Sequence, residues 1–276
     1  MKKFGIITLA LAFLLSGCSS DDKKAAALLQ RAEASFAAGN LNDAKLQIDS
    51  IRTLYPKSFE VRKAGIRLMQ QVDLREQKKT LAYLDSMMQV KIASLDSIRG
   101  HFVLEKDTAY QEIGNYFYPT QIVEKNIGRS FLRAQVSELG EMSLTSIYCA
   151  GGSLHHTAVK VSTGEVFAET QPSKDSYETT DLGEKIEKAD FKLGEDGNVM
   201  GFLYLNKDKN IKVNYQGERP YSITMTPADR QALASVYELA QLLSSMTEIK
   251  KNMEEANLKI EFVKKKMEER KDNAQE

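Results

Sequence analysis

Apolar residues recur with helical spacing near both ends of the chain. From Phe59 to Arg99 there is no proline and Gly65 is the only glycine. Apolar positions within this stretch are three, four or seven residues apart, which predicts one long amphipathic helix. These positions are Leu74, Leu81, Leu84, Met88, Leu95 and Ile98.

A second long helix is expected in the range 226–276. Thr226 suits the N-cap, Pro227 the first helical position and Asp229 the first turn. Downstream, apolar residues step by three and four, which is a heptad pattern. They are Met246, Ile249, Met253, Ala256, Ile260, Val263 and Met267. So narrow an apolar face needs a partner helix, and the helix over 59–101 is the economical choice; a coiled coil between chains is the alternative. The lysines and glutamates beside it indicate a solvated face or, alternatively, a charged docking strip.

The helical period disappears between about 102 and 225. Short runs rich in aromatic and β-branched residues alternate there with turn residues, which is typical of antiparallel strands. The expected strands are Phe131–Val136, Leu144–Cys149, Thr157–Val161, Glu165–Glu169, Lys185–Leu193, Val199–Leu205, Ile211–Tyr215 and Ser222–Met225. The segments 195–198 and 207–210 are expected to form turns, the first of them within a hairpin.

The range 24–58 predicts a helical hairpin. Gly39 should end its first helix, Asn40 should cap the second, and Pro56 should follow its end. The spacing resembles one tetratricopeptide repeat, although Leu28 and Ser35 stand where that family often has Trp and Tyr. The matching positions are Ala32, Gly39, Ala44, Ile48, Ile51 and Pro56.

Together these patterns predict an α+β protein. It would have an N-terminal helical hairpin and a long antiparallel coiled-coil stalk, with an inserted, mostly antiparallel β domain that forms a small sandwich or open barrel. The expected divisions are 1–17 signal peptide, 18–23 lipidated tether, 24–58 tetratricopeptide-like hairpin, 59–101 first stalk helix, 102–225 β domain and 226–276 second stalk helix.

The N-terminus reads as an export signal. Lys2 and Lys3 precede an apolar run from Phe4 to Leu15, which is too short to span a bilayer comfortably. The sequence Leu15-Ser16-Gly17-Cys18 resembles the lipobox of bacterial lipoproteins, which implies cleavage before Cys18 and its acylation, for example with palmitate. Asp21 and Asp22 resemble the export signal of Bacteroidetes-type surface lipoproteins; a solvated tether is the alternative. The resemblance implies an outer-membrane anchor in the cell envelope, with the protein facing the periplasm or the surface.

Charge and composition narrow the classes of partner. Loss of residues 1–17 would remove two lysines and leave 36 basic against 38 acidic residues. Such a balance gives no electrostatic reason to expect nucleic acid. Phosphate-binding and dinucleotide-binding glycine motifs are absent, so no cofactor is expected.

One cluster has residue types suited to catalysis: Cys149, Ser153, His155 and His156. If Cys18 carries lipid, Cys149 has no disulfide partner in the chain and is either a buried apolar side chain or a reactive thiol. A cysteine nucleophile needs a histidine base, and a glycine turn at Gly151-Gly152 could bring one back. The alternative is a strand that ends in a polar turn. Adjacent histidines on a strand face opposite ways, so no metal site is expected.

Tyr116, Phe117 and Tyr118, together with Tyr110, could line a ligand groove or pack in the core. The sequence therefore favours a non-enzymatic envelope lipoprotein that acts as a scaffold or adaptor for an envelope protein partner. The alternative is a surface binding module whose β domain captures glycan or peptide. A hydrolase or thiol enzyme built on cysteine and histidine is a third possibility.

Overall fold

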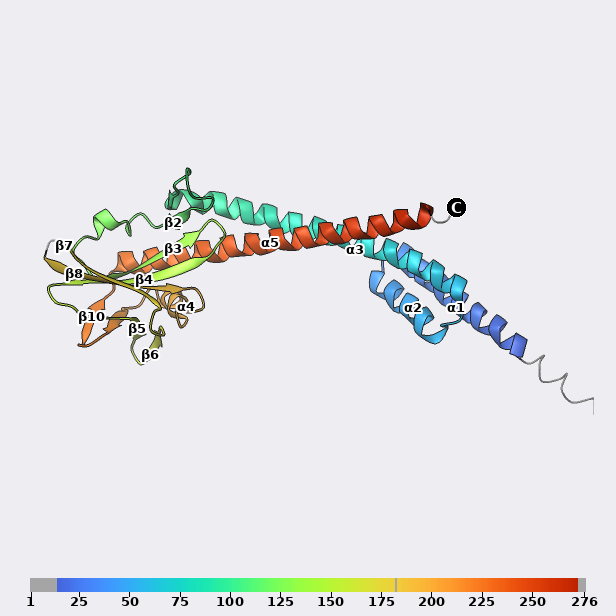
Figure 1. The fold of residues 1–276 in the computed structure, drawn as a ribbon, viewed down its shortest axis with the longest axis horizontal. Helices are drawn as coiled ribbons and strands as arrows, with labels where there is room; N and C mark the ends of the chain where they lie inside the picture. The colour runs from blue at the N-terminus through green and yellow to red at the C-terminus, as the bar shows by residue number, and fades with distance from the viewer. Residues whose placement is uncertain (1–13, 182, 273–276) are drawn as a thin grey trace, which may run out of the picture. The chain divides into compact units, whose positions relative to one another are not determined.

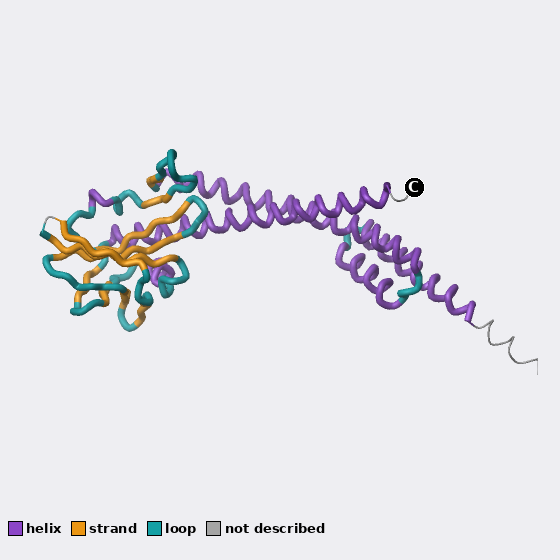
Figure 2. The backbone as a smooth tube through the Cα atoms, in the orientation of Figure 1, coloured by secondary structure: helices purple, strands orange, loops and turns teal. Residues whose placement is uncertain are grey.

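The computed structural model describes residues 14–181 and 183–272, which divide into two compact units (Figure 1). A helical unit takes the residues up to Ser86 and those from Lys251 onward, and a β unit runs from Met87 to Lys250. Helices and two antiparallel sheets make up the regular structure of these residues (Figure 2). The α+β class expected from the sequence is therefore confirmed.

The N-terminal signal lies mostly outside the described residues, as does the side chain of Cys18. The first helix, α1 (Leu14–Ala37), includes the range 18–23, where a tether was expected. Among the described residues, no helix combines the length and the apolar character that crossing a membrane requires.

The helical unit contains α1, α2 (Leu41–Leu54), the first part of α3 (Phe59–Ile98) and the last part of α5 (Pro227–Asp272). Gly39, with φ of +84°, makes the turn between α1 and α2, a conformation that glycine adopts without strain. Asn40 holds the N-cap position of α2, but its side chain makes no capping hydrogen bond. Small and branched side chains fill the core between the helices: Ala32, Leu41, Ala44, Ile48, Leu68 and Val72.

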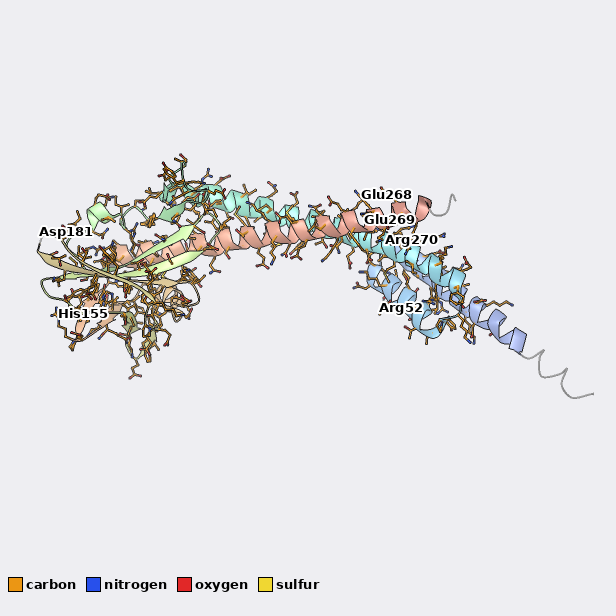
Figure 3. All side chains as sticks on the ribbon, viewed as in Figure 1. Arg52, His155, Asp181, Glu268, Glu269 and Arg270 are labelled. Atoms are coloured by element: carbon orange, nitrogen blue, oxygen red, sulfur yellow. The ribbon has the colours of Figure 1, made fainter. Side chains whose placement is uncertain are left out.

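The apolar faces predicted for the two long helices are their least exposed faces. On α3, Leu84 and Met88 are buried, and on α5 so are Ala256 and Ile260. Within the helical unit, Arg270 Nη1 donates a hydrogen bond of 3.3 Å to Gln70 Oε1 (Figure 3). The end of α5 therefore lies beside α3 in this unit.

The β unit holds two antiparallel sheets in its described residues. The larger has the order β1-β2-β3-β4-β8-β7, with bounds Val103–Glu105, Asn115–Phe117, Phe131–Ser137, Met142–Ala150, Glu184–Lys192 and Asp175–Asp181. The smaller has the order β10-β9-β5-β6, with bounds Tyr221–Thr224, Lys212–Gln216, Ala158–Thr163 and Val166–Glu169. Neither sheet closes into a barrel. Two short 3₁₀ helices, Arg99–His101 and Val123–Lys125, flank β1 and β3.

Both sheets share one hydrophobic core with the first part of α5. Side chains on several sides of this part are buried, among them Ala232, Leu233, Ala234, Val236 and Leu239. An amphipathic surface helix would bury only one face. For this reason the β unit extends beyond the expected range 102–225 and includes parts of both long helices.

The segment Val199–Leu205 was expected to be a strand, and this expectation was wrong: it forms a short helix, α4. Asp196 Oδ2 accepts a hydrogen bond of 3.0 Å from the backbone N–H of Met200, which satisfies a donor of the first helical turn. Asn198 precedes the helix in a left-handed conformation, with φ of +62°. The segment 195–198 is a turn, as expected, but it leads from β8 into α4 and does not join two strands of a hairpin.

Candidate functional site

A cavity of about 410 Å³ lies on the outer face of the six-stranded sheet, away from the core. Its floor comes from β3, β4, β8 and β7, and the segment between β2 and β3 bounds it from outside. The lining is Val123, Asn126, Ile127, Gly128, Arg129, Phe131, Arg133, Ile147, Cys149, Thr179, Thr180, Asp181, Ile186 and Lys188. Its volume is in the range of small-molecule sites.

Strand register arranges the floor in rows. Phe131 lies opposite Ile147, which in turn lies opposite Lys188. In the next row, Cys149 lies opposite Ile186, which is paired with Thr179. Two adjacent rows of mostly apolar side chains therefore form the middle of the cavity.

One end of the cavity is cationic. Arg133 lies one row beyond Phe131, and the centre of its guanidinium group is 4.1 Å from the centroid of the Phe117 ring. Its Nε is buried and has no hydrogen-bond partner among the described residues. Burial lowers the pKa of Arg133, against the opposing influence of nearby carboxylates. Lys188, which lines the same cavity, forms no ion pair with a described carboxylate.

The opposite end is acidic. Asp181 lines the cavity and is paired in the strand register with Glu184. Glu184 Oε2 accepts a hydrogen bond of 2.9 Å from Cys149 Sγ. Burial, and then the carboxylate of Glu184, raise the pKa of Cys149 to about 11. The thiol is thus protonated at neutral pH, which is the opposite of an activated nucleophile.

The structure does not bring together the cysteine and histidines expected as a cluster. Cys149 lines the outer cavity, whereas His156 is buried in the core on the other face of the sheet. The exposed His155 has its Nδ1 3.0 Å from Glu178 (Figure 3). Ser153 accepts a hydrogen bond from Arg219 through its backbone oxygen. Both histidines therefore have partners other than the thiol.

A different polar cluster lies in the core. Ser146 Oγ is 2.8 Å from His156 Nε2, and His156 Nδ1 is 3.0 Å from Glu187 Oε2. This is the order of contacts in a serine–histidine–carboxylate triad. All three side chains are at most 2% exposed, and none lines the cavity described above. Ser146 is fully buried, and the hydrogen bonds of the cluster join β4, β8 and the segment before β5.

Backbone geometry explains how Glu187 is held. His155 has a left-handed conformation, with φ of +53°. The backbone N–H groups of Leu154, His155 and His156 all donate to the Glu187 carboxylate. Successive N–H groups around such a residue form an anion-binding nest.

The nest also determines the charges of the pair. Burial alone would raise the pKa of Glu187, but the converging N–H groups and His156 together lower it. Burial lowers the pKa of His156, with Glu187 acting in the opposite direction. At neutral pH the core therefore holds a carboxylate beside a neutral imidazole.

Potential ligand atoms of His155, Glu178 and Glu187 lie within 4.8 Å of one another. The two oxygens of Glu187 already accept three backbone N–H groups and face His156 Nδ1. Glu178 faces His155. Hydrogen bonding within the chain accounts for this proximity without a metal ion.

The aromatic residues expected to line a groove are mostly covered. Tyr116 belongs to the core, and Phe117 lies under the guanidinium of Arg133. Tyr118 packs edge to face against Phe102, with ring centroids 5.9 Å apart. Tyr110 is 90% exposed, apart from them. Phe117 thus supports the cavity wall through Arg133 and does not offer its own face to solvent.

The sequence contained a signal for Glu187, because Ala189 and Phe191 alternate with charged residues and the same period places Glu187 on the inner face. It contained none for Arg133 and Lys188, whose proximity depends on strand register.

Comparison with protein-family models, with curated proteins and with solved structures finds no significant match.

Proposed function

We propose that this chain is an envelope lipoprotein, anchored through Cys18, whose β unit is a non-enzymatic module that binds a small ligand. The cavity on the six-stranded sheet carries the proposal, since it combines an apolar floor with charged groups at its ends. Such a combination is typical of ligand sites. The protonated thiol of Cys149 and the buried position of Ser146 support binding rather than catalysis.

Native mass spectrometry can test ligand binding after the purified protein has been incubated with an envelope extract. We expect a small-molecule adduct on the wild-type chain. Ile186→Trp should fill the cavity and abolish the adduct, because Ile186 lies in its floor. Tyr177→Trp is the matched control, since Tyr177 is exposed on β7 outside the lining. Absence of an adduct on the wild type, or its persistence on Ile186→Trp, would contradict the proposal.

The anchor needs its own experiment. Cells supplied with labelled palmitate should label the wild-type chain and not Cys18→Ser, with equal amounts of protein confirmed by immunoblot. External protease on intact cells then distinguishes the two orientations: loss of the β unit indicates the surface, and protection indicates the periplasm. Labelling of Cys18→Ser at the wild-type level would contradict acylation at this residue.

A scaffold is the second candidate, and the helical unit provides its supporting observation. Large apolar side chains are exposed there: Leu46, Leu54, Phe59, Ile66 and Tyr83. A cavity of about 310 Å³ between α2 and α3 is lined by Ile48, Ile51, Ile66 and Met69 among others. A contiguous exposed apolar surface marks protein interaction sites, and the exposed Ile66 also lines this cavity. The tetratricopeptide-like hairpin and the supercoiled pairing of α3 with α5 belong to this proposal.

Crosslinking in intact cells tests the scaffold. Ile66→Asp should abolish crosslinks to an envelope partner, because Ile66 is 45% exposed beside the apolar cavity. Thr80→Asp, an exposed position on the same helix, is the control. Equal crosslinking of both variants would exclude this surface as the docking site.

A further inference from the structure

The cavity is polarised along the strands of the six-stranded sheet. Lys188 and Arg133 lie at one end, and Asp181 lies at the other, beside Glu184. The row that contains Ile186 separates Lys188 from Asp181, and the row of Phe131 and Ile147, which is level with Lys188, also lies between Arg133 and Asp181. A ligand that matches this arrangement has an anionic end, a cationic end and an apolar middle.

Strand geometry gives the spacing. Lys188 and Glu184 are four residues apart on β8, and Asp181 is level with Glu184 in the register. Arg133 lies one row beyond Lys188, and at roughly 3.3 Å per strand residue Lys188 and Asp181 are about 13 Å apart along the strands. An extended chain spans roughly 3.3–3.6 Å per residue, so four residues cover this distance.

Arg133 gives an independent indication of an anion. Its Nε is buried, and no described group accepts a hydrogen bond from it. Burying a donor of a charged group without an acceptor is costly, and a carboxylate would remove that cost. A guanidinium group also binds a carboxylate through two parallel hydrogen bonds.

We propose that the cavity binds a short extended peptide of about four residues through its free ends, with the carboxylate at Arg133 and Lys188 and the amino group at Asp181. This rests on the proposed binding function of the β unit. The apolar floor would accept the middle side chains.

The absence of tryptophan from the chain allows a direct assay. The probe is Ala-Trp-Val-Ala with free ends, whose tryptophan can be excited selectively and followed by fluorescence anisotropy. We expect saturable binding of the free peptide. The affinity should fall at least tenfold for the C-amidated peptide, and likewise at least tenfold for the N-acetylated peptide. Decanoate, an apolar anion without an amino group, is the comparison ligand, added as a competitor.

Variants of the lining residues test which side chain recognises each end of the peptide. Arg133→Gln and Lys188→Gln should each weaken the free peptide several-fold and leave the amidated peptide unchanged. Asp181→Asn should weaken the free peptide and not the acetylated one. Lys192→Gln and Asp175→Asn are matched controls, because they lie on the same strands and the same face but outside the lining. Thermal unfolding checks that each variant folds.

The outcomes separate this inference from the proposed function. Equal binding of the free and amidated peptides, or unchanged binding by Lys188→Gln, would overturn recognition of the carboxylate while the cavity remains a binding site. Tight binding of decanoate without binding of the peptide would contradict peptide recognition, while the proposed function of binding a small ligand would stand. If the chain binds neither probe nor any adduct from an envelope extract, both proposals fail.

Discussion

Arg129 and Asp229, one hundred positions apart in the sequence, form a two-point ion pair in the β unit. Arg129 Nη2 lies 2.6 Å from Asp229 Oδ1, and Nη1 lies 2.9 Å from Oδ2. The Asp229 side chain is only 6% exposed. The Asp229 carboxylate also accepts a hydrogen bond from the Thr226 hydroxyl group. The backbone N–H of Asp229 in turn donates a hydrogen bond to the Thr226 hydroxyl oxygen. The segment that bounds the cavity is thereby fastened to the first turn of α5.

Loss of this pair should destabilise the β unit. Arg129→Gln leaves a nearly buried carboxylate without its counter-charge, which should lower the free energy of unfolding by about 2–4 kcal/mol. Urea unfolding followed by near-UV circular dichroism measures the change. Arg52→Gln is the control, because Arg52 and Asp49 form an exposed pair on α2 that should contribute about 0–1 kcal/mol. Similar losses for the two variants would contradict this account.

Much of the β unit could be predicted from the sequence, because alternation of apolar and polar residues reports which face of a strand is buried. The strands expected at 131–136 and 144–149 correspond to β3 and β4. The N-cap role of Thr226 is also confirmed, since its hydroxyl accepts the Asp229 N–H. These features depend on local sequence alone.

Features that depend on burial or register could not be predicted. In α4 the residues from Val199 to Leu203 are all buried, and an apolar run without periodicity fits a strand as well as a helix. The edge strand β7 is mostly exposed and polar, so it lacks alternation. Arg133 on β3 and Lys188 on β8 line the same cavity, but the sequence pattern does not indicate how these strands are ordered in the sheet.

Gly140 should tolerate substitution poorly. It has φ of +86°, and a Cβ there would overlap the backbone of Ser244 on α5. Gly140→Ala should therefore combine backbone strain with overpacking and destabilise by roughly 2–4 kcal/mol. Gly164→Ala is the control: its φ is +58°, but a Cβ there meets open space. We expect a loss of about 1–2 kcal/mol from strain alone in that variant. Thermal unfolding of both variants checks the difference, and an equal loss would show that α5 moves aside without cost.

Acid should weaken the β unit through His156 and Glu187. The pKa of His156 is lowered in the folded state. The contribution of His156 to the free energy of unfolding is therefore complete above the pKa that this histidine has in the unfolded chain, and it falls as the pH drops below about 6.5. The pKa of Glu187 is also lowered, so its contribution is lost as the pH falls from about 4.5. Below pH 6.5, His156 alone should reduce the free energy of unfolding by up to about 1.4 kcal/mol per pH unit. Urea unfolding at a series of pH values from 7.5 to about 4 measures this slope.

His155 provides the contrast for that experiment. Glu178 raises its pKa, so its contribution is present at low pH and is lost as the pH rises through its folded pKa. His155→Gln should therefore retain the acid destabilisation, whereas His156→Gln should flatten the slope between pH 7 and about 5.5. A slope unchanged by His156→Gln would assign the acid sensitivity to other groups.

Cys149 should react slowly with alkylating agents. Its pKa of about 11 leaves far less thiolate at neutral pH than an ordinary cysteine has, by roughly 100-fold or more. In a Cys18→Ser background, where Cys149 is the sole thiol, alkylation by iodoacetamide can be followed by mass spectrometry. Glu184→Gln should accelerate the reaction, because the Glu184 carboxylate is the second cause of the raised pKa. Glu165→Gln, an exposed position in the turn between β5 and β6, should leave the rate unchanged. Rapid alkylation of the folded wild-type thiol near pH 7 would instead indicate an activated nucleophile and return the thiol enzyme to consideration.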